Sequence, residues 1–586
     1  MPSVYLLHFY IFFCLVLITF LISQCVYSHA PRQEESMFSS VTTGAVFGIE
    51  SYCMQVETDI SDGLPSFTMV GYLSHEIRES GERVKTAIRN AGISIPASRI
   101  VVNFSPADIP KQGVVVDLPV AAGILCSLGV LNNEDVKGVL IAGELGLDGV
   151  IKPVRGVLPI VRTARENGIH TCVLPVENVA EGAVFDDMKI VGVDTIRKMI
   201  RYLLEPIETR DRIIAPTRVD IQALFTEQRA NDGLDFADVH GQHAAKRALE
   251  ISAAGFHNVL MTGPPGSGKS MLARRMPGIL PPLTMKESME VSMIYSIAGR
   301  IPQGTSLITK RPFIAPHHTI TRSALTGGGT IPTPGVITLA DHGIVFMDEF
   351  PEFGRENIDL LRQPLEDHEI QISRLTGVFT YPARFLLLAA MNPCPCGYFP
   401  DVNKCNCTEP DIKRYLGKIS GPILDRIDMC VSTPQVEINE LMDGSKEESS
   451  AVIASRVMES RQRQEFRFRG MGFLFNADMD SRAVEKFCKL GSSEEKLLKS
   501  VFKKLEMSAR TYHRVLKTAR TIADLGGSEN IRDDDIMEAV GYRMSDYMSR
   551  SQTEFDHRGT ERTAREHTKS VRDISNHTGK EVRKYE

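Results

Sequence analysis

Short apolar runs alternate with helical stretches through the middle of the chain. Two of these runs are Asn258–Thr262 and Ile344–Met347, and a third, within "RFLLLAAMNP", closes at Asn392. Apolar runs without polar alternation are typical of strands that are buried on both faces. A helical pattern begins at Met271, and strands that alternate with helices predict a parallel α/β sheet. Ligands bind such sheets at the carboxyl ends of the strands, so the polar residues that close these runs are candidate site residues.

The flanking regions show different patterns. Before the core, β-like segments such as "SYCMQVETDI" and "SRIVVNFSP" mix with the helical segments "SGERVKTAIRNAG" and "DLPVAAGILCSLG". After the core the chain is mostly helical, and Ser508 suits the N-cap of a helix that runs to Leu525. The last segment is charged and poor in apolar residues, which predicts a disordered tail. We therefore divide the chain into a leader (1–36), an N-terminal α+β domain (37–204), a linker (205–234), the core (235–440), a helical lid (441–547) and the tail (548–586).

The leader contains the most hydrophobic stretch of the chain. Val4–Val26 has no Asp, Glu, Lys or Arg and is long enough to span a bilayer. No Lys or Arg precedes it, so the basic start of a secretory signal is missing. Three interpretations stay open: a membrane anchor, an extension upstream of a true start at Met37, or an export signal. The first two leave the rest of the chain in the cytosol, so we expect a cytoplasmic protein that contacts a membrane only if the 4–26 segment is a genuine anchor.

Composition and charge narrow the choice of partners. A formal net charge of −6 and a pI near 6.2 give no overall attraction to nucleic acid. Nucleic-acid binding must then come from local basic surfaces. The eleven cysteines are too few and too scattered for a disulfide framework, which favours a reducing compartment.

A phosphate-binding loop follows the first apolar run. Its sequence "GPPGSGKS" fits G-x-x-x-x-G-K-S and lies between a strand and a helix. Backbone N–H groups of such a loop wrap phosphates at a helix N-terminus, the lysine reaches the β- and γ-phosphates, and the serine hydroxyl ligates Mg²⁺. The predicted ATP-binding residues are Gly263, Pro264, Pro265, Gly266, Ser267, Gly268, Lys269, Ser270 and, from the second run, Asp348, with Ser270 and Asp348 serving Mg²⁺.

Polar residues close the other two runs. Asp348 and Glu349 follow Ile344–Met347, and in a site of this kind Asp348 orients Mg²⁺ through its water shell while Glu349 polarises the attacking water. An Asp-Glu pair alone is common surface chemistry, but the phosphate-binding loop upstream favours a catalytic role. Asn392 is placed to hold the attacking water or the γ-phosphate, with an ordinary Asn-Pro turn as the alternative.

Longer motifs resemble a known family. The runs "APHHT…ALTGGG…PGVITLADHGIVFMDEFPEF", "QPLEDHEIQISR", "YPARFLLLAAMNPCPCG" and "GPILDRIDM" are similar to the ComM/YifB group of magnesium-chelatase-like AAA+ ATPases. The resemblance extends from about Asp235 to Leu525, and a fainter one covers Met37 to about Ile200. It implies an α/β P-loop AAA+ core with a helical C-terminal lid, preceded by an α+β Lon-protease-like domain of the ribosomal S5 type.

The resemblance also assigns roles to residues. Asp238–Gln242 matches the segment that packs near the adenine, and Asn392 matches sensor 1. Arg426 matches an arginine finger that acts on ATP bound by a neighbouring subunit, and Arg510 matches sensor 2 on the lid. An arginine that acts in trans requires a homo-oligomeric ring, and the family suggests a hexamer. An ion pair of Arg426 with Asp425 or Asp428, and Arg514 as the lid arginine, are the alternatives.

A β-hairpin is predicted just before the third apolar run, because apolar positions alternate on both sides of Gly377. The family places such a hairpin in the central pore of the ring, where single-stranded or branched DNA would pass. Basic side chains repeated around a ring can grip a phosphate backbone. The hairpin's apolar positions are Ile370, Ile372, Leu375, Val378 and Phe379, and the candidate basic residues are Arg374 near its tip with Lys310, Arg311 and Arg322. His317 and His318 are expected to point opposite ways from an extended segment and to serve loop structure or polymer contact.

Four cysteines follow Asn392 within one short segment. Cys394, Cys396, Cys405 and Cys407 form C-x-C-x₈-C-x-C, which is tighter than the common zinc spacing. A structural Cys₄ zinc site, two disulfides and four unliganded thiols are the alternatives, and a reducing compartment favours zinc.

Two functions compete for these motifs. The first is a Mg²⁺- and ATP-dependent ring motor on DNA, a helicase that promotes branch migration in recombination during natural transformation. The second is the ATPase subunit of a magnesium-chelatase-type complex or of another protein-remodelling complex. A Lon-type peptidase needs a Ser–Lys dyad, and the matching positions hold Val115 and Leu158, so peptidase activity is not expected.

Overall fold

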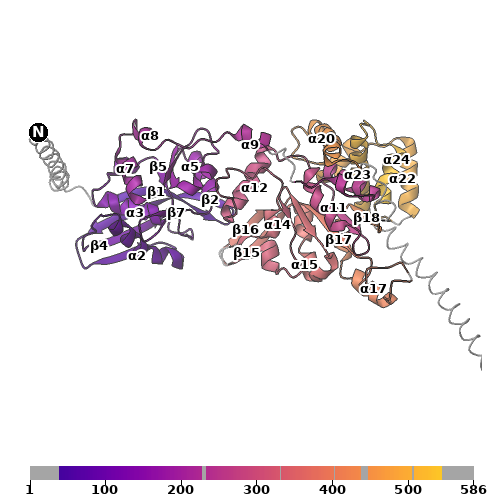
Figure 1. Ribbon diagram of the computed structural model, residues 1–586, viewed down its shortest axis with the longest axis horizontal. Coiled ribbons are helices and arrows are strands. Elements are labelled where there is room, and N and C mark those ends of the chain that lie inside the picture. The colour runs from indigo at the N-terminus through magenta and orange to yellow at the C-terminus, as the bar shows by residue number, and fades with distance from the viewer. Residues whose placement is uncertain are drawn as a thin grey trace, which may run out of the picture.

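The computed structural model describes residues 38–111, 113–227, 233–329, 332–375, 377–401, 403–436, 447–504 and 507–543. The predicted leader and tail lie outside these ranges. Within them, no helix combines the length and the hydrophobicity that crossing a membrane requires. The N-terminal domain lies at one end of the long axis of the molecule, and the sheet-containing core extends to the other end, where the C-terminal helices lie beside it (Figure 1).

The N-terminal domain is built on a mixed sheet of seven strands in the order β3-β4-β2-β1-β5-β8-β9. The strands are β1 (Phe38–Phe47), β2 (Glu50–Ser61), β3 (Ser66–Val70), β4 (Arg99–Ser105), β5 (Val139–Ile141), β8 (Thr171–Pro175) and β9 (Lys189–Val193). The main helices are α2 (His75–Asn90), α3 (Asp117–Ser127), α5 (Val157–Glu166) and α7 (Ile196–Leu204). Helices α3 and α5 pack on β1 and β2. The expected strands and helices are present, which confirms the α+β prediction.

Shorter elements complete this domain and lead into the core. They are α4 (Asn133–Val136), β6 (Glu144–Leu145), β7 (Ile151–Lys152), α6 (Val179–Gly182), α8 (Arg210–Ile213) and α9 (Ile221–Glu227). The last two lie in the segment that we predicted as a linker. Ile221 and Phe225 of α9 pack against buried residues of both the N-terminal domain and the core, so this part of the segment is attached to the folded body.

The core contains a five-stranded parallel sheet in the order β11-β14-β17-β10-β18. The strands are β10 (Val259–Thr262), β11 (Phe313–Ile314), β14 (Ile344–Met347), β17 (Leu386–Met391) and β18 (Met429–Ser432). Alternate residues of the central strands face two different hydrophobic clusters: Phe346 and Leu388 belong to one, and Val345 and Leu387 to the other. Burial on both faces explains the unbroken apolar runs and confirms the predicted parallel sheet.

Helices surround this sheet, and a hairpin projects from it. The helices are α10 (His243–Gly255), α11 (Lys269–Arg275), α12 (Met285–Ile297), α13 (Arg322–Thr326), α14 (Val336–Leu339), α15 (Gly354–Asp359), α16 (Arg362–Asp367), α17 (Glu409–Leu416) and α18 (Gly421–Leu424). The predicted hairpin is present as β15 (Glu369–Arg374) and β16 (Gly377–Pro382). The short strands β12 (Gly327–Gly328) and β13 (Thr333–Pro334) pair with each other nearby.

The C-terminal region is helical, as predicted. It consists of α20 (Ser450–Arg467), α21 (Ser481–Phe487), α22 (Ser492–Lys504), α23 (Ala509–Leu525) and α24 (Asp533–Gly541). The hydroxyl of Ser508 caps α23 by accepting a hydrogen bond from the Thr511 N–H at 3.2 Å, which confirms the predicted N-cap. Helix α23 packs against α10 and α20, so the lid shares a hydrophobic cluster with the sheet.

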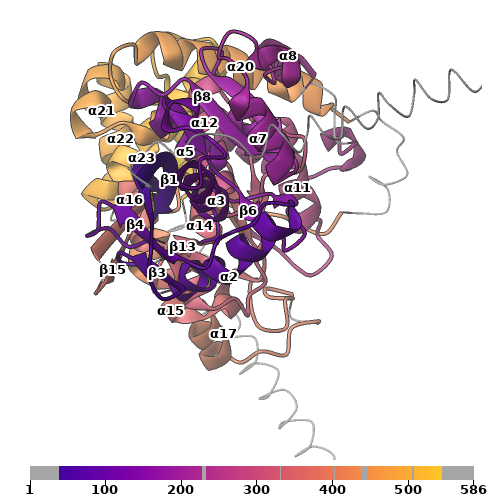
Figure 2. The same ribbon diagram turned by 90° about the vertical axis from the view of Figure 1, so that its left-hand side faces the viewer.

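Among the described residues, two groups of contacts join the N-terminal domain to the core, and a view from the N-terminal end shows this domain in front of the core (Figure 2). At the first, Ser296 of α12 accepts a hydrogen bond from the Leu158 N–H at 3.3 Å and donates one to the buried Glu181 carboxylate. Leu158 is fully buried beside Leu307 of the core. At the second, the Phe47 ring lies 5.0 Å from the Phe379 ring of the hairpin. The position that matches a peptidase lysine therefore holds a buried leucine at a domain contact.

A buried charge network supports β14. His342, two residues before the start of that strand, donates from Nε2 to Glu290 at 2.7 Å and lies 3.5 Å from Glu287. Arg311 pairs with Glu287 at 3.2 Å and donates to the His342 carbonyl at 2.6 Å. Burial opposes the charged form of His342, but the carboxylates of Glu287 and Glu290 and the charge of Asp341 outweigh it and raise the pKa of His342 to about 9. The charged imidazolium thus fixes the start of a central strand.

The stabilisation that His342 provides should depend on pH. A histidine whose pKa is raised on folding stabilises the protein fully below its unfolded pKa of about 6.5 and loses the effect as the pH rises through the folded value. We expect His342→Gln to be less stable than the wild type by about 1–3 kcal/mol at pH 6.5 and by much less at pH 9.5. Melting temperatures measured across this range check the prediction, with exposed His75→Gln as the control. A gap that stays constant with pH would contradict it.

Candidate active site

The phosphate-binding loop joins β10 to α11 as the sequence predicts. Gly266 and Gly268 have φ angles of 75° and 87°, a backbone conformation that glycine adopts without strain. The Lys269 ammonium lies inside the loop and donates to the carbonyls of Gly263 at 2.8 Å and Pro264 at 2.9 Å. Burial lowers the pKa of Lys269, and the charge of Asp348 opposes this shift. A buried cation whose partners are uncharged oxygen atoms suits a phosphate ligand.

Oxygen ligands meet at the start of α11. The Ser270 hydroxyl donates to Asp348 Oδ2 at 2.5 Å, and Asp348 Oδ1 accepts from the Glu349 N–H at 2.9 Å. A hydroxyl and a carboxylate of this kind fit Mg²⁺, which prefers oxygen ligands and keeps several waters. Glu349 has a φ of 50°, a strained value for a residue with a side chain. Its carboxylate is more than half exposed, so it is open to water and to a ligand.

The third predicted strand end joins the same site. Asn392 follows β17, which lies between β10 and β14 in the sheet, and its Oδ1 accepts from Lys269 at 3.3 Å. The structure therefore brings together Lys269, Ser270, Asp348 and Asn392 at the carboxyl ends of three adjacent strands.

The segment Asp238–Gln242, which the resemblance places near the adenine, also contacts the phosphate-binding loop. The Gln242 side-chain amide donates to the Ser267 carbonyl at 3.1 Å and to the Pro434 carbonyl at 2.6 Å. Thr433 was not predicted: its hydroxyl lies 3.1 Å from the Ser267 hydroxyl, and its N–H donates to Thr262 at 2.8 Å. Thr433 directly follows β18, so the argument from polar strand ends could have identified it.

Arg426 and Arg510 lie at the opposite edge of the sheet. The Arg426 carbonyl accepts from the Asn258 side chain at 3.2 Å, and Asn258 precedes β10, whereas the phosphate-binding loop follows that strand. Arg426 forms an ion pair with Glu366 of α16, and Arg510 lies 3.5 Å from the same carboxylate. Arg514 pairs with Asp428 at 2.5 Å. The expected alternative, an ion pair of Arg426 with a neighbouring aspartate, is not what the structure contains.

Arg426, Arg510 and Arg514 line a cavity of about 630 Å³. Burial, followed by the charges of Arg510, Arg514 and Arg362, lowers the pKa of Arg426. The cavity is also lined by acidic side chains, among them Glu366 and Asp428, which pair with Arg426 and Arg514. Because the cluster and the phosphate-binding loop lie at opposite edges of one sheet, the arginines suit an anion that is supplied by another molecule.

Two sequence-based expectations are corrected here. Arg311 was expected near a pore, but its side chain is 8% exposed and it pairs with Glu287. His317 and His318 were expected to point apart, but a turn brings their rings to 4.1 Å from each other, and His318 Nδ1 lies 3.5 Å from Glu349.

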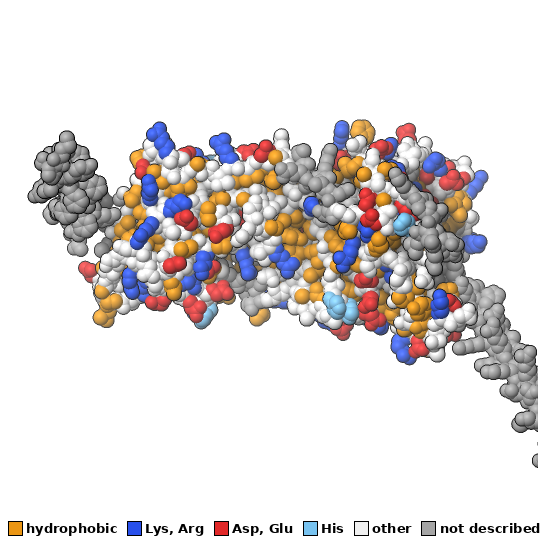
Figure 3. All heavy atoms as spheres, in the orientation of Figure 1, with side chains coloured by type: hydrophobic (Ala, Val, Ile, Leu, Met, Phe, Trp, Pro, Cys, Tyr) orange, Lys and Arg blue, Asp and Glu red, His pale blue; other side chains and the backbone are white. Residues whose placement is uncertain are grey.

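The hairpin presents apolar and basic residues at its end. Leu375 is fully exposed and Val378 is 67% exposed. Arg374 donates to the Gly329 carbonyl at 3.1 Å, and Arg322 is paired with Glu356. Lysine and arginine side chains elsewhere on the face shown in Figure 3 are interspersed with acidic ones. The described part of the hairpin end therefore carries one basic side chain, Arg374, beside two exposed apolar ones.

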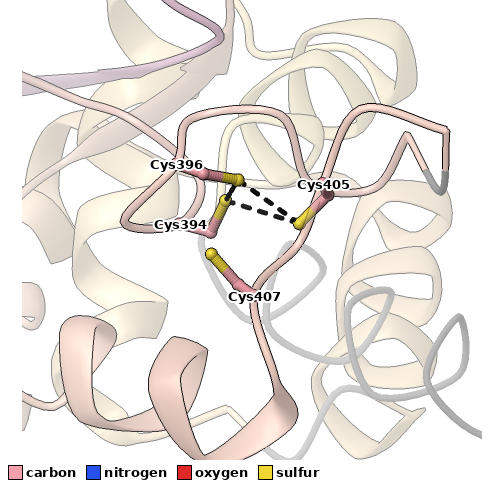
Figure 4. Close-up of side chains that lie close together, drawn as sticks. All are labelled: Cys394, Cys396, Cys405 and Cys407. Carbon is pink, nitrogen blue, oxygen red and sulfur yellow. Dashed lines mark hydrogen bonds between the residues drawn. The ribbon is translucent and has the colours of Figure 1, made fainter.

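The four cysteines lie together beside this site. Their side chains point toward one another from a single loop between β17 and α17 (Figure 4), and their sulfur atoms all lie within 4.8 Å of each other. The sequence spacing predicted this proximity.

This chain is similar to known proteins over most of its length. Residues 235–441 match the family described as magnesium chelatase, subunit ChlI, residues 56–178 match subunit ChlI of Mg-chelatase, and residues 447–543 match magnesium chelatase, subunit ChlI C-terminal. The competence protein ComM of Haemophilus influenzae is 39% identical over 507 residues, which cover 86% of this chain and 97% of that protein. YifB of Escherichia coli is 38% identical over 512 residues, which cover 87% and 97%. Lon protease 2 of Bacillus subtilis is 25% identical over 199 residues, 30% of this chain and 35% of that protein.

Proposed function

Because the chain belongs to the ComM/YifB family of magnesium-chelatase-like AAA+ ATPases, we propose that it is a Mg²⁺-dependent ring motor that hydrolyses ATP to move on DNA. Membership makes it an ATPase of this family. The observation that supports a ring is that the phosphate-binding residues and the proposed arginine finger of one chain lie far from each other. Lys269, Ser270 and Asp348 lie at the carboxyl edge of the sheet, and Arg426 with Arg510 lies at the other edge. A complete site then needs two subunits, which a closed ring supplies at every interface.

DNA is the proposed polymer for two reasons. The exposed end of the hairpin offers Arg374 beside Leu375 and Val378, and such residues repeated around a ring can grip a phosphate backbone despite an acidic total charge. One relative is a competence protein, and competence is the uptake of DNA. We therefore propose helicase or branch-migration activity in recombination during natural transformation, by a hexamer with single-stranded or branched DNA in its pore.

A second candidate follows from the family descriptions. All three matching families are named after a magnesium chelatase subunit, and the same ATP site could drive a partner that inserts Mg²⁺ into a porphyrin, or remodel another protein. Stimulation of hydrolysis by partner subunits and porphyrin would identify this function. Stimulation by DNA alone would favour the motor.

The proposed cofactors are ATP and Mg²⁺ at the strand ends and a structural Zn²⁺ at the four cysteines. ATP would place its phosphates against Lys269, and Mg²⁺ would bind between Ser270 and Asp348. Glu349 would orient and polarise the attacking water, with Asn392 holding it or the γ-phosphate.

Hydrolysis should respond to DNA in a salt-dependent way. We expect a chain that starts at Met37 to hydrolyse ATP faster with single-stranded or forked DNA, and the stimulation to fade as salt rises, since released counterions drive phosphate binding. Phosphate release measured over a salt series with single-stranded, duplex and forked DNA checks this. Arg374→Ala should lower the stimulation and leave the DNA-free rate unchanged, with exposed Arg469→Ala as the matched control. Hydrolysis that is indifferent to every DNA would reject the DNA motor and direct the search to a protein partner.

A further inference from the structure

The sulfur atoms of the four-cysteine loop (residues 394–407) are spaced for one metal ion. Cys394 Sγ lies 3.3 Å from Cys396 Sγ and 3.8 Å from Cys405 Sγ, and the last two are 3.6 Å apart. Four thiolates around a tetrahedral zinc ion, each about 2.3 Å from it, lie about 3.8 Å from one another. A disulfide would require about 2.05 Å, and all four are free thiols. The distances therefore agree with zinc and exclude the two-disulfide alternative for this structure.

The surroundings of the sulfurs also suit thiolates. The N–H groups of Gly397 and Phe399 donate to Cys394 Sγ at 3.2 and 3.4 Å. Donors of this kind stabilise a metal-bound thiolate and orient it. The loop has its own small hydrophobic cluster, in which Cys394, Phe399 and Ile412 are buried. Such a small cluster provides little folding energy, so a metal is the natural means of holding the loop in shape.

The loop is in contact with the ATP site. Cys394 follows Asn392 by two residues, and the Gly397 backbone lies against the phosphate-binding loop. A Cβ atom added to Gly397 would be 2.6 Å from Pro265 Cδ and 3.7 Å from Asn392 Cγ. On the other side, Thr408 follows Cys407 and caps α17, and the hydroxyl of Tyr415 in that helix is hydrogen-bonded by the Asn392 backbone. The four-cysteine loop thus touches Asn392 and Pro265 directly.

We propose that Cys394, Cys396, Cys405 and Cys407 bind one structural Zn²⁺, and that this clip positions Asn392 and Pro265 for ATP binding and hydrolysis. The ion takes part in no chemical step. The second half of the proposal rests on the proposed ATPase site, whereas the first half stands independently of it.

Metal content tests the first half without any activity assay. We expect the purified full chain to contain about one zinc per chain by elemental analysis, and Co²⁺ in its place to give the absorption of a tetrahedral thiolate complex. Cys405→Ser and Cys407→Ser should lose most of the zinc. Cys126→Ser, which removes a thiol in the N-terminal domain, should keep it. Wild-type protein that stays zinc-free after reconstitution with zinc under reducing conditions would overturn the site, whether or not the serine variants fold.

Nucleotide affinity and turnover test the second half. Zinc-free protein, prepared with a chelator, should bind a fluorescent ATP analogue at least fivefold more weakly and hydrolyse ATP about tenfold more slowly, and added Zn²⁺ should restore both. Gly397→Ala should keep the zinc and still weaken hydrolysis, because its methyl group would displace Pro265. Zinc-free protein with unchanged affinity and turnover would overturn the coupling. A wild type that binds ATP but ignores DNA would overturn only the proposed DNA motor.

Discussion

Glu349→Gln is expected to bind ATP as tightly as the wild type and to hydrolyse it about 10²–10⁴ times more slowly, the range for loss of a general base. The amide keeps the size of the side chain but cannot draw a proton from water. The residues proposed to hold phosphate and Mg²⁺ contact other groups: Lys269 donates to Gly263 and Ser270 to Asp348, without the Glu349 side chain. Fluorescent-nucleotide binding and phosphate release on the same preparation measure the two effects separately.

Glu352→Gln is the matched control for this variant. It removes an acidic group three residues away that forms an exposed ion pair with Lys418 at 2.9 Å, and we expect little change in turnover. Retained hydrolysis in Glu349→Gln would reject Glu349 as the residue that polarises the water. Lost ATP binding would indicate instead that the carboxylate supports the loop.

Arg426→Ala is expected to assemble and bind ATP but to lose about 10³-fold in turnover, at the lower end for an arginine finger. Arg426 and the phosphate-binding loop of the same chain lie at opposite edges of the sheet, so we expect its effect on hydrolysis to act across a subunit boundary. Mixing it with Lys269→Ala tests this directly. In random mixed rings about a quarter of the interfaces combine an intact loop with an intact Arg426, and activity should return to roughly that fraction.

Arg355→Ala, which removes an exposed arginine of the same core, is the control and should behave like the wild type. Absence of rescue in mixed rings, once subunit exchange is verified, would reject action in trans. Size measurements on each variant separate loss of assembly from loss of catalysis.

The part of the site that could be predicted from sequence is the part built from strand ends. Lys269, Asp348 and Asn392 each follow an apolar run, and parallel strands bring their carboxyl ends to one edge. The arginine cavity could not be predicted in the same way. Glu366 is one of several acidic residues near α16, and only tertiary packing brings it to Arg426 of the core and to Arg510 of the lid.

The wrong expectations have a common physical cause. Arg311 occurs in a polar segment, and its carboxylate partner, Glu287, precedes it by 24 residues, so the sequence pattern suggested exposure where the structure has a buried ion pair. The histidine pair was assigned to an extended segment, and a turn at His318 changed the direction of its side chain. The cysteines were correctly expected to gather, but the contact of Gly397 with Pro265 depends on tertiary packing.

The contacts between the N-terminal domain and the core limit how the protein can be divided for experiments. Removing the N-terminal domain by a cut in the 205–234 segment would expose two core residues. These are Leu307, which packs on Leu158, and Phe379, which packs on Phe47. An isolated ATPase fragment would expose apolar surface beside its hairpin, and such surface promotes aggregation. Dissection would therefore need polar replacements at these two contacts, and loss of activity in a simple truncation would not reveal the role of the domain that was removed.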